Sequence, residues 1–146
     1  MNKTYLVAIL AVVIVLVGLF LLGNNLQNTA SLGDANIKVP EGFKIINSTK
    51  NSLKIGNNNT NYSITVSNES ISSITDKYNK KHENDTVIDK DLKVGNITVK
   101  NLTLEKDGEI IHSNYFYKAN NKTYHIFPKG KWDEKSFATI INSTSN

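Results

Sequence analysis

The chain has 146 residues and a formal net charge of +4, with 17 lysines, no arginine and no cysteine. Without cysteine, neither a disulfide nor a lipid-modified cysteine anchor can form. The lysines are spread along the whole chain, and arginine, the side chain preferred for bidentate contacts to phosphates and bases, does not occur, so we expect no nucleic-acid partner.

The first element is an uncharged apolar run of 18 residues, Tyr5 to Leu22. As a helix this run would be about 27 Å long, close to the roughly 30 Å thickness of bilayer hydrocarbon. Lys3 is the charged side chain beside the run and precedes it, so the positive-inside rule places the N-terminus in the cytoplasm. We therefore predict that residues 1–23 form a single transmembrane anchor in the cell membrane, with the lipid bilayer as partner and the C-terminal domain extracytoplasmic.

A cleaved secretory signal is the alternative interpretation of this run. The apolar core of such a signal is usually about 7–15 residues long and is closely followed by a small-x-small cleavage site. The run from Tyr5 to Leu22 is longer, and Thr29-Ala30-Ser31 lies well beyond its end. A retained anchor is the preferred interpretation, and both interpretations export the remaining chain.

Residues 24–36 are rich in Gly, Asn, Ser and Thr, which predicts a flexible linker. From residue 37 onwards the apolar residues alternate with polar ones, the pattern of half-buried strands, with turns at Pro40-Glu41-Gly42 and at the Asn57-Asn58-Asn59 cluster. The alternating residues are Ile37 and Val39, then Phe43 and Ile45, then Leu53 and Ile55, then Tyr62, Ile64 and Val66.

The spacing changes at Ser70, where apolar residues recur at i, i+3 and i+7. This spacing predicts a helix from Ser70, its N-cap, to about Glu83. A short strand at Val87 and Ile88 and a turn at Gly95-Asn96 follow. Apolar residues then move from odd positions (Ile97, Val99) to even positions (Leu102, Leu104), which predicts a bulge near Asn101.

Two hairpins are predicted next. Lys106-Asp107-Gly108 closes the first, and Asn120-Asn121 closes the second, because Asn tolerates the positive φ of a two-residue turn. The second turn sets a register with Tyr117 opposite Tyr124, Tyr115 opposite Ile126, and Phe116 opposite His125. Apolar residues then occur on both faces of the sheet.

A second helix is predicted to begin at Asp133, with Trp132 and Phe137 forming a hydrophobic staple around its first turn. Strands, helix, strands and helix thus follow one another. This order predicts an α+β fold, an antiparallel β-sheet with helices packed on both faces.

That element order, the Val39-Pro40-Glu41-Gly42-Phe43 opening and the closing helix from Trp132 to Phe137 resemble the PsbP-like domain, a small antiparallel sheet sandwiched between helices. The resemblance covers about Ile37 to Asn142, within a predicted domain of residues 37–146, and its signals are those of a fold, without a catalytic motif. It implies a non-enzymatic accessory or binding module that acts on larger assemblies.

Residues with catalytic or metal-binding chemistry do not form a recognisable motif. Neither Gly-x-Ser-x-Gly nor Ser-x-x-Lys occurs, so no activated nucleophile is predicted. His112 and His125 are expected to lie about 13 Å apart along the sheet, too far to share a metal. His82 is expected at a helix C-terminus. We predict no enzyme activity, no cofactor and no metal site.

Two further sets of residues have plain interpretations. Asp85, Asp89 and Asp91 could bind a cation but lack the calcium-loop spacing, so a solvated charged loop is the preferred interpretation. The aromatic residues Tyr115, Tyr117, Tyr124 and Trp132 are expected in the core rather than in a ligand platform.

Asparagine is unusually common, with 21 in the chain. Nine Asn-x-Ser/Thr acceptors follow the apolar run, about twice the number expected by chance, and they suggest a glycosylated surface domain. The acceptors are Asn47, Asn58, Asn61, Asn68, Asn84, Asn96, Asn101, Asn121 and Asn142.

Taken together, these features predict a membrane-anchored, non-catalytic binding or accessory module that contacts another envelope or membrane protein. The alternative is a small-molecule or cation-binding sensor domain of the same topology.

Overall fold

The computed structural model describes residues 28–144, which form nine strands and two helices. The predicted anchor, Tyr5 to Leu22, lies outside the described residues. Within residues 28–144 no helix is both long enough and apolar enough to span a membrane. The elements are β1 (Thr29–Leu32), β2 (Ala35–Lys38), β3 (Lys44–Ser48), β4 (Ser52–Gly56), β5 (Thr60–Ser67), α2 (Ile71–Lys81), β6 (Thr86–Val94), β7 (Ile97–Lys106), β8 (Glu109–Ala119), β9 (Lys122–Gly130) and α3 (Glu134–Thr144).

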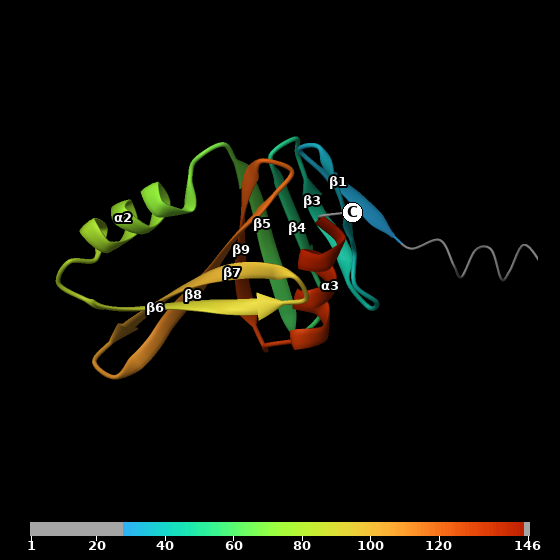
Figure 1. The fold of residues 1–146 in the computed structure, drawn as a ribbon. Helices are drawn as coiled ribbons and strands as arrows, with labels where there is room; N and C mark the ends of the chain where they lie inside the picture. The colour runs from blue at the N-terminus through green and yellow to red at the C-terminus, as the bar shows by residue number, and fades with distance from the viewer. Residues whose placement is uncertain (1–27, 145–146) are drawn as a thin grey trace, which may run out of the picture.

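Two antiparallel sheets organise these strands (Figure 1). Strands β1 and β2 form a small hairpin, and the other seven pair in the order β3-β4-β5-β9-β8-β7-β6. Strands β3 to β5 form one series of hairpins and strands β6 to β9 form another. The two series join where β5 pairs with β9, at the centre of the large sheet.

The β1–β2 hairpin occupies a segment for which the sequence predicts a flexible linker. Leu32 is fully buried and Ala30 and Ala35 nearly so. The carbonyl of Asn28 accepts a hydrogen bond of 2.7 Å from the amide of Val39. Residues 29–36 are therefore part of the folded domain and cover the sheet near β3 and β4.

The main core lies between one face of the large sheet and α3. Tyr62, Tyr117 and Tyr124 are fully buried on this face, and Phe137 and Ile140 of α3 are buried against it. The hydroxyls of Tyr117 and Thr144 form a hydrogen bond of 2.8 Å inside this core. This bond ties the last turn of α3 to the sheet.

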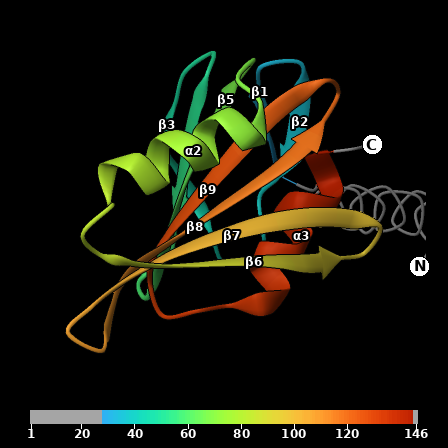
Figure 2. The ribbon, with the colours of Figure 1, turned by 60° about the vertical axis from the view of Figure 1, so that its left-hand side comes forward.

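The opposite face carries α2 without a comparable core. In Figure 2, α2 passes in front of the sheet and α3 behind it. No residue of α2 is buried, and the helix meets the sheet through polar contacts such as that between the Tyr78 hydroxyl and His112 Nε2. Of the described residues, 56% are in strands and 19% are in helices. The prediction of an α+β fold with helices packed on both faces is therefore wrong, because the fold is β-rich and only α3 buries its apolar stripe.

The expected bulge near Asn101 is also misplaced. Pairing between β7 and β8 is unbroken from Val99 to Leu104, and the irregularity lies between Leu104 and Glu105. The apolar residues change parity because Val99 faces the α3 core while Leu102 and Leu104 are buried on the opposite face.

The predicted hairpins and helix starts are confirmed. Asn120 and Asn121 have φ of 52° and 59°, and Tyr117 pairs with Tyr124, as expected. The Ser70 hydroxyl caps α2 by accepting a hydrogen bond from the amide of Ser73.

Candidate functional site

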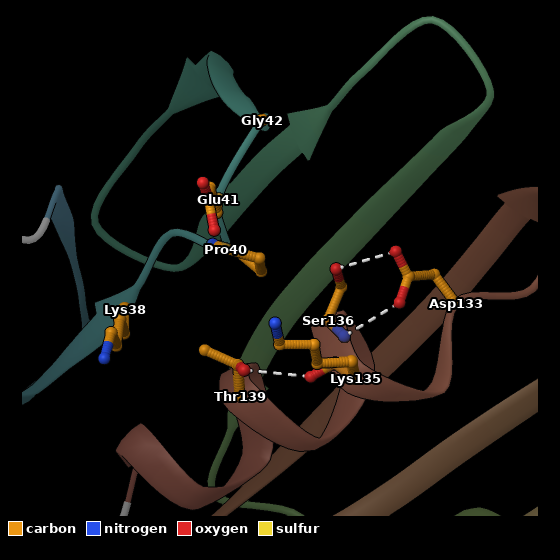
Figure 3. Close-up of a pocket in the computed structure, with 8 residues that line it drawn as sticks. All are labelled: Lys38, Pro40, Glu41, Gly42, Asp133, Lys135, Ser136 and Thr139. Carbon is orange, nitrogen blue, oxygen red and sulfur yellow. Dashed lines mark hydrogen bonds between the residues drawn. The ribbon is translucent and has the colours of Figure 1, made fainter.

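A hollow of about 460 Å³ lies between the turn after β2 and the beginning of α3 (Figure 3). Its walls are polar and carry charges of both signs. The residues around it are Lys38, Pro40, Glu41, Gly42, Asp133, Lys135, Ser136 and Thr139.

Buried neighbours hold the first wall in place. Val39, Pro40 and Phe43 are buried, whereas Glu41 and Gly42 between them are exposed. The carbonyl of Pro40 accepts a hydrogen bond of 3.0 Å from the amide of Phe43, and Gly42 has a φ of +79°. The left-handed backbone at Gly42 suits glycine, and it directs Glu41 to the rim of the hollow.

The second wall is the first turns of α3, which Asp133 caps. Its two carboxylate oxygens accept hydrogen bonds of 3.0 Å and 2.9 Å from the amide and hydroxyl of Ser136. These bonds hold the pKa of Asp133 below its usual range. The carboxylate is thus ionised and committed to the helix cap, which leaves it poorly suited to accept a proton from a substrate.

The hollow continues as a groove along α3. A second hollow of about 400 Å³ also contacts Lys38, Lys135 and Thr139 and extends to Asn142 and Ser143. The amide of Lys38 donates a hydrogen bond of 2.9 Å to the Ser143 hydroxyl, which holds β2 beside α3. Asp133 and Ser143 are ten residue steps apart along α3, which gives the groove a length of about 15 Å.

The charged side chains of the groove are free to contact a ligand. In Figure 3 the Lys135 ammonium extends from α3 towards Pro40 and Glu41 on the other wall. Across residues 28–144, none of Lys38, Glu41 and Lys135 takes part in an ion pair within 4.0 Å. Besides the Asp133 carboxylate that caps α3, the groove therefore offers the Glu41 carboxylate, two lysine ammonium groups and helix hydroxyls to a ligand.

The three histidines lie elsewhere, between α2 and the sheet. His82 Nδ1 lies 3.0 Å from Asp85 Oδ2, and His112 Nε2 lies 2.9 Å from the Tyr78 hydroxyl. The rings of His82 and His112 are 6.4 Å apart between centroids. Burial is the main cause that lowers the pKa of His112, so its ring is neutral near neutral pH.

His125 is the most enclosed of the three. Its ring stacks on Phe116 at 4.5 Å, and its Nε2 lies 2.8 Å from the Asn114 side-chain oxygen. Burial lowers the pKa of His125 to about 4. Among residues 28–144, no group of three or more His, Asp or Glu is placed to hold a metal ion.

The structure separates the predicted acidic cluster. Asp89 and Asp91 both contact the Lys100 ammonium, at 2.8 Å and 2.9 Å, whereas Asp85 pairs with His82. Two of these three carboxylates therefore share one lysine, which offsets one of their two negative charges.

The predicted aromatic set is largely core. Tyr115, Tyr117 and Tyr124 are buried, as expected, but Trp132 is 47% exposed and stacks on Tyr115 at 5.5 Å. Trp132 also lies 4.8 Å from Phe137 between ring centroids, which agrees with the predicted staple.

The acceptor asparagines are mostly at the surface. Asn61 and Asn101 are half-buried within β5 and β7, and the Asn101 side chain accepts a hydrogen bond of 2.7 Å from Thr103. The other seven are exposed, namely Asn47, Asn58, Asn68, Asn84, Asn96, Asn121 and Asn142.

No sequence pattern predicts the groove. Lys38, Lys135 and Thr139 read as ordinary surface residues, and only the Pro40-Glu41-Gly42 turn marks the place where one wall forms. No protein-family model matches this chain, and no curated protein matches it either.

Proposed function

We propose that this protein is a membrane-anchored, non-catalytic binding module, and that the groove along α3 receives an extended polar segment of another membrane or envelope protein. The observation that carries the proposal is the pair of opposite charges, Glu41 and Lys135, on facing walls of one hollow. A peptide segment offers both kinds of partner, since its backbone and side chains supply donors and acceptors together.

The distance between the groove and the bilayer supports a membrane partner. If Tyr5 to Leu22 is the anchor, only residues 23–27 separate it from Asn28, which hydrogen bonds to Val39 next to the groove. Six residue steps span at most about 20 Å when fully extended. The groove is thus held near the membrane surface, where the extracytoplasmic part of a neighbouring membrane protein is within reach.

The PsbP-like resemblance remains part of this proposal. It rests on the order of elements along the chain, the Val39 to Phe43 opening and the closing helix from Trp132 to Phe137, and it implies the same accessory role. The sheet sandwiched between helices that it also implied is not found, because no residue of α2 is buried. The sensor alternative has less support, because the Tyr78, His82 and His112 rings pack on one another and fill the space that a ligand would need.

Site-specific photocrosslinking tests the proposal in native membranes. A photoreactive residue replaces Thr139 in the groove of the intact chain, and the same residue replaces Asp76, on α2, as the control position. We expect an adduct of one defined mass from position 139 and none of that mass from position 76.

Charge variants show whether the groove itself makes the contact. Lys135→Glu and Glu41→Lys should each lower the yield of the adduct at least fivefold, whereas Lys80→Glu on the exposed face of α2 should leave it unchanged. Equal yields from all variants, an adduct of the same mass from position 76, or an adduct with twice the mass of this chain would overturn the proposed partner contact.

A further inference from the structure

Charges are unevenly distributed over the large sheet. Residues 42–68, which form β3, β4 and β5, contain no Asp or Glu, and neither do residues 110–132, which include β9. Lysines occur in both stretches. Lys122 pairs with Asp34 at 2.9 Å. Within residues 28–144, Lys44, Lys54 and Lys129 take part in no ion pair, so the surface around these three lysines has a positive potential.

The cationic side chains meet on the sheet face opposite α3. Lys54 and Ser63 are direct neighbours across β4 and β5, and Asn61 is the neighbour of Lys129 across β5 and β9. Their Cβ atoms therefore lie within about 5 Å of one another in each pair. A hollow of about 320 Å³ forms over them, lined by Lys54, Asn58, Asn59, Asn61, Ser63 and Lys129 together with Phe127 and Gly130. No carboxylate is among its lining residues.

The backbone around this hollow is fixed. The Asn57 side-chain oxygen accepts hydrogen bonds of 2.9 Å and 2.8 Å from the amides of Asn59 and Thr60. The carbonyl of Asn59 accepts one of 3.0 Å from the amide of Lys131. Gly130 has a φ of +98°, and a Cβ there would lie 2.2 Å from that carbonyl, so a side chain at this position cannot be accommodated.

The fixed backbone leaves two amide side chains pointing to solvent. Asn58 and Asn59 are exposed, and within the described part of the chain their side chains contact no hydrogen-bond partner of the protein. An unmodified amide group can donate two hydrogen bonds and accept two. Asn59 is outside the Asn-x-Ser/Thr acceptors and keeps this capacity, whereas Asn58 keeps it only where it carries no glycan. Their position is set by the turn, so little conformational freedom of the backbone is lost when a ligand binds.

The surface extends beyond one hollow. A neighbouring hollow of about 560 Å³ also contacts Asn58 and Asn59 and reaches Lys44 on the edge strand β3. Three strand spacings separate β3 from β9, so Lys44 and Lys129 are about 14 Å apart across the sheet. The asparagine turn lies between these two lysines.

From this arrangement we propose that the Lys54, Lys129 and Asn57–Asn59 surface binds an anionic oligosaccharide, a chain of sugars that carries carboxylate or phosphate groups. Asparagine amides pair well with adjacent sugar hydroxyls, which also donate and accept. The lysine ammonium groups bind the anionic substituents as point charges. Phe127 offers an apolar surface to the C–H face of a ring. This site is separate from the groove on α3 and does not depend on a protein partner there.

Binding to defined oligosaccharides tests this proposal with the full chain reconstituted in detergent-free phosphatidylcholine nanodiscs. The probes are tetragalacturonic acid, neutral maltotetraose, and vesicles of phosphatidylglycerol and phosphatidylcholine, with affinity measured by calorimetry at fixed ionic strength. We expect tetragalacturonic acid to bind at least tenfold more tightly than maltotetraose. The double variant Lys54→Gln with Lys129→Gln should weaken that binding at least tenfold, and Asn59→Ala at least threefold.

The matched control is Lys90→Gln with Lys106→Gln, which removes two exposed lysines elsewhere and should change the affinity less than twofold. All four lysines are exposed, so each variant should keep the far-UV circular dichroism and melting temperature of the wild type. The proposal fails if the control weakens binding as much as the site variant. It also fails if tetragalacturonic acid does not bind at millimolar concentration. The last contradicting result has two parts: vesicles displace tetragalacturonic acid from the wild type, and the site variant binds the vesicles as tightly as the wild type does.

Discussion

The enclosed ring of His125 leads to a specific dependence of stability on pH. An exposed histidine in the unfolded chain has a pKa of about 6.5, whereas burial lowers the pKa of His125 in the folded protein to about 4. Between these two values the unfolded chain binds a proton that the folded protein does not. The stability contributed by the neutral ring is therefore complete above pH 6.5 and is lost as the pH falls towards 4.

The size of this loss follows from the difference between the two pKa values. Each unit corresponds to about 1.4 kcal/mol, and half of the folded molecules are protonated at pH 4, so the free energy of unfolding should fall by about 3 kcal/mol between pH 7.5 and pH 4. Within residues 28–144 no carboxylate pairs with the ring to offset the cost of protonating it. The ring Nε2 contacts the Asn114 side-chain oxygen, and the ring face contacts Phe116.

Urea unfolding measures this loss when the wild type is compared with His125→Gln at pH 7.5, 6, 5 and 4. Trp132, the only tryptophan, stacks on Tyr115 and provides a fluorescence signal for unfolding. The glutamine variant should be less stable at pH 7.5, and the difference should shift by about 3 kcal/mol in favour of the variant by pH 4. The other ionisable groups are the same in both proteins, so their effects cancel. A difference that stays constant across this pH range would show that protonation of the His125 ring does not destabilise the folded protein.

Three further predictions concern the packing of the domain, each measured by urea unfolding at pH 7.5. Phe137→Ala removes a 2% exposed ring from the centre of the α3 interface, and we expect a loss of 3–5 kcal/mol, roughly, as for other buried rings. Tyr117→Phe removes the hydrogen bond to Thr144, which keeps its bond to the Ile140 carbonyl, so the loss should be about 1 kcal/mol. Asn121→Val places a β-branched residue at a φ of 59° and should cost about 1–3 kcal/mol, while Asn121→Gly should cost less than 1 kcal/mol, roughly. Losses below 1 kcal/mol for Phe137→Ala, or equal losses for the two Asn121 variants, would contradict the packing described here.

Local sequence signals predicted the hairpins well, because their cause is local. Asn120-Asn121 and Asp107-Gly108 adopt the positive φ that these residue types tolerate. The Asn120-Asn121 turn fixes the register of β8 and β9, whereas the register set by Asp107-Gly108 changes between Glu105 and Leu104. The Asp133 cap and the contact between Trp132 and Phe137 are likewise set within one helical turn.

The features that the sequence did not predict depend on contacts between distant segments. The β1–β2 hairpin relies on Ala30 and Ala35, whose small side chains give a weak apolar signal until the sheet covers them. The apolar residues Ile71, Ile74 and Tyr78 indicate which side of α2 faces the sheet. Their spacing does not indicate how deeply that side is buried. The groove joins Lys38 to Ser143, which are 105 residues apart, so no local pattern could reveal it.

The most direct test of the central claim combines fractionation with surface proteolysis of intact cells that produce the full-length chain. If the chain is a membrane-anchored module displayed outside, it should stay in the membrane pellet after alkaline carbonate washing, and protease added to whole cells should remove the domain. Recovery of the uncut chain in the soluble fraction without detergent, or protection of the domain until the cells are lysed, would contradict the account.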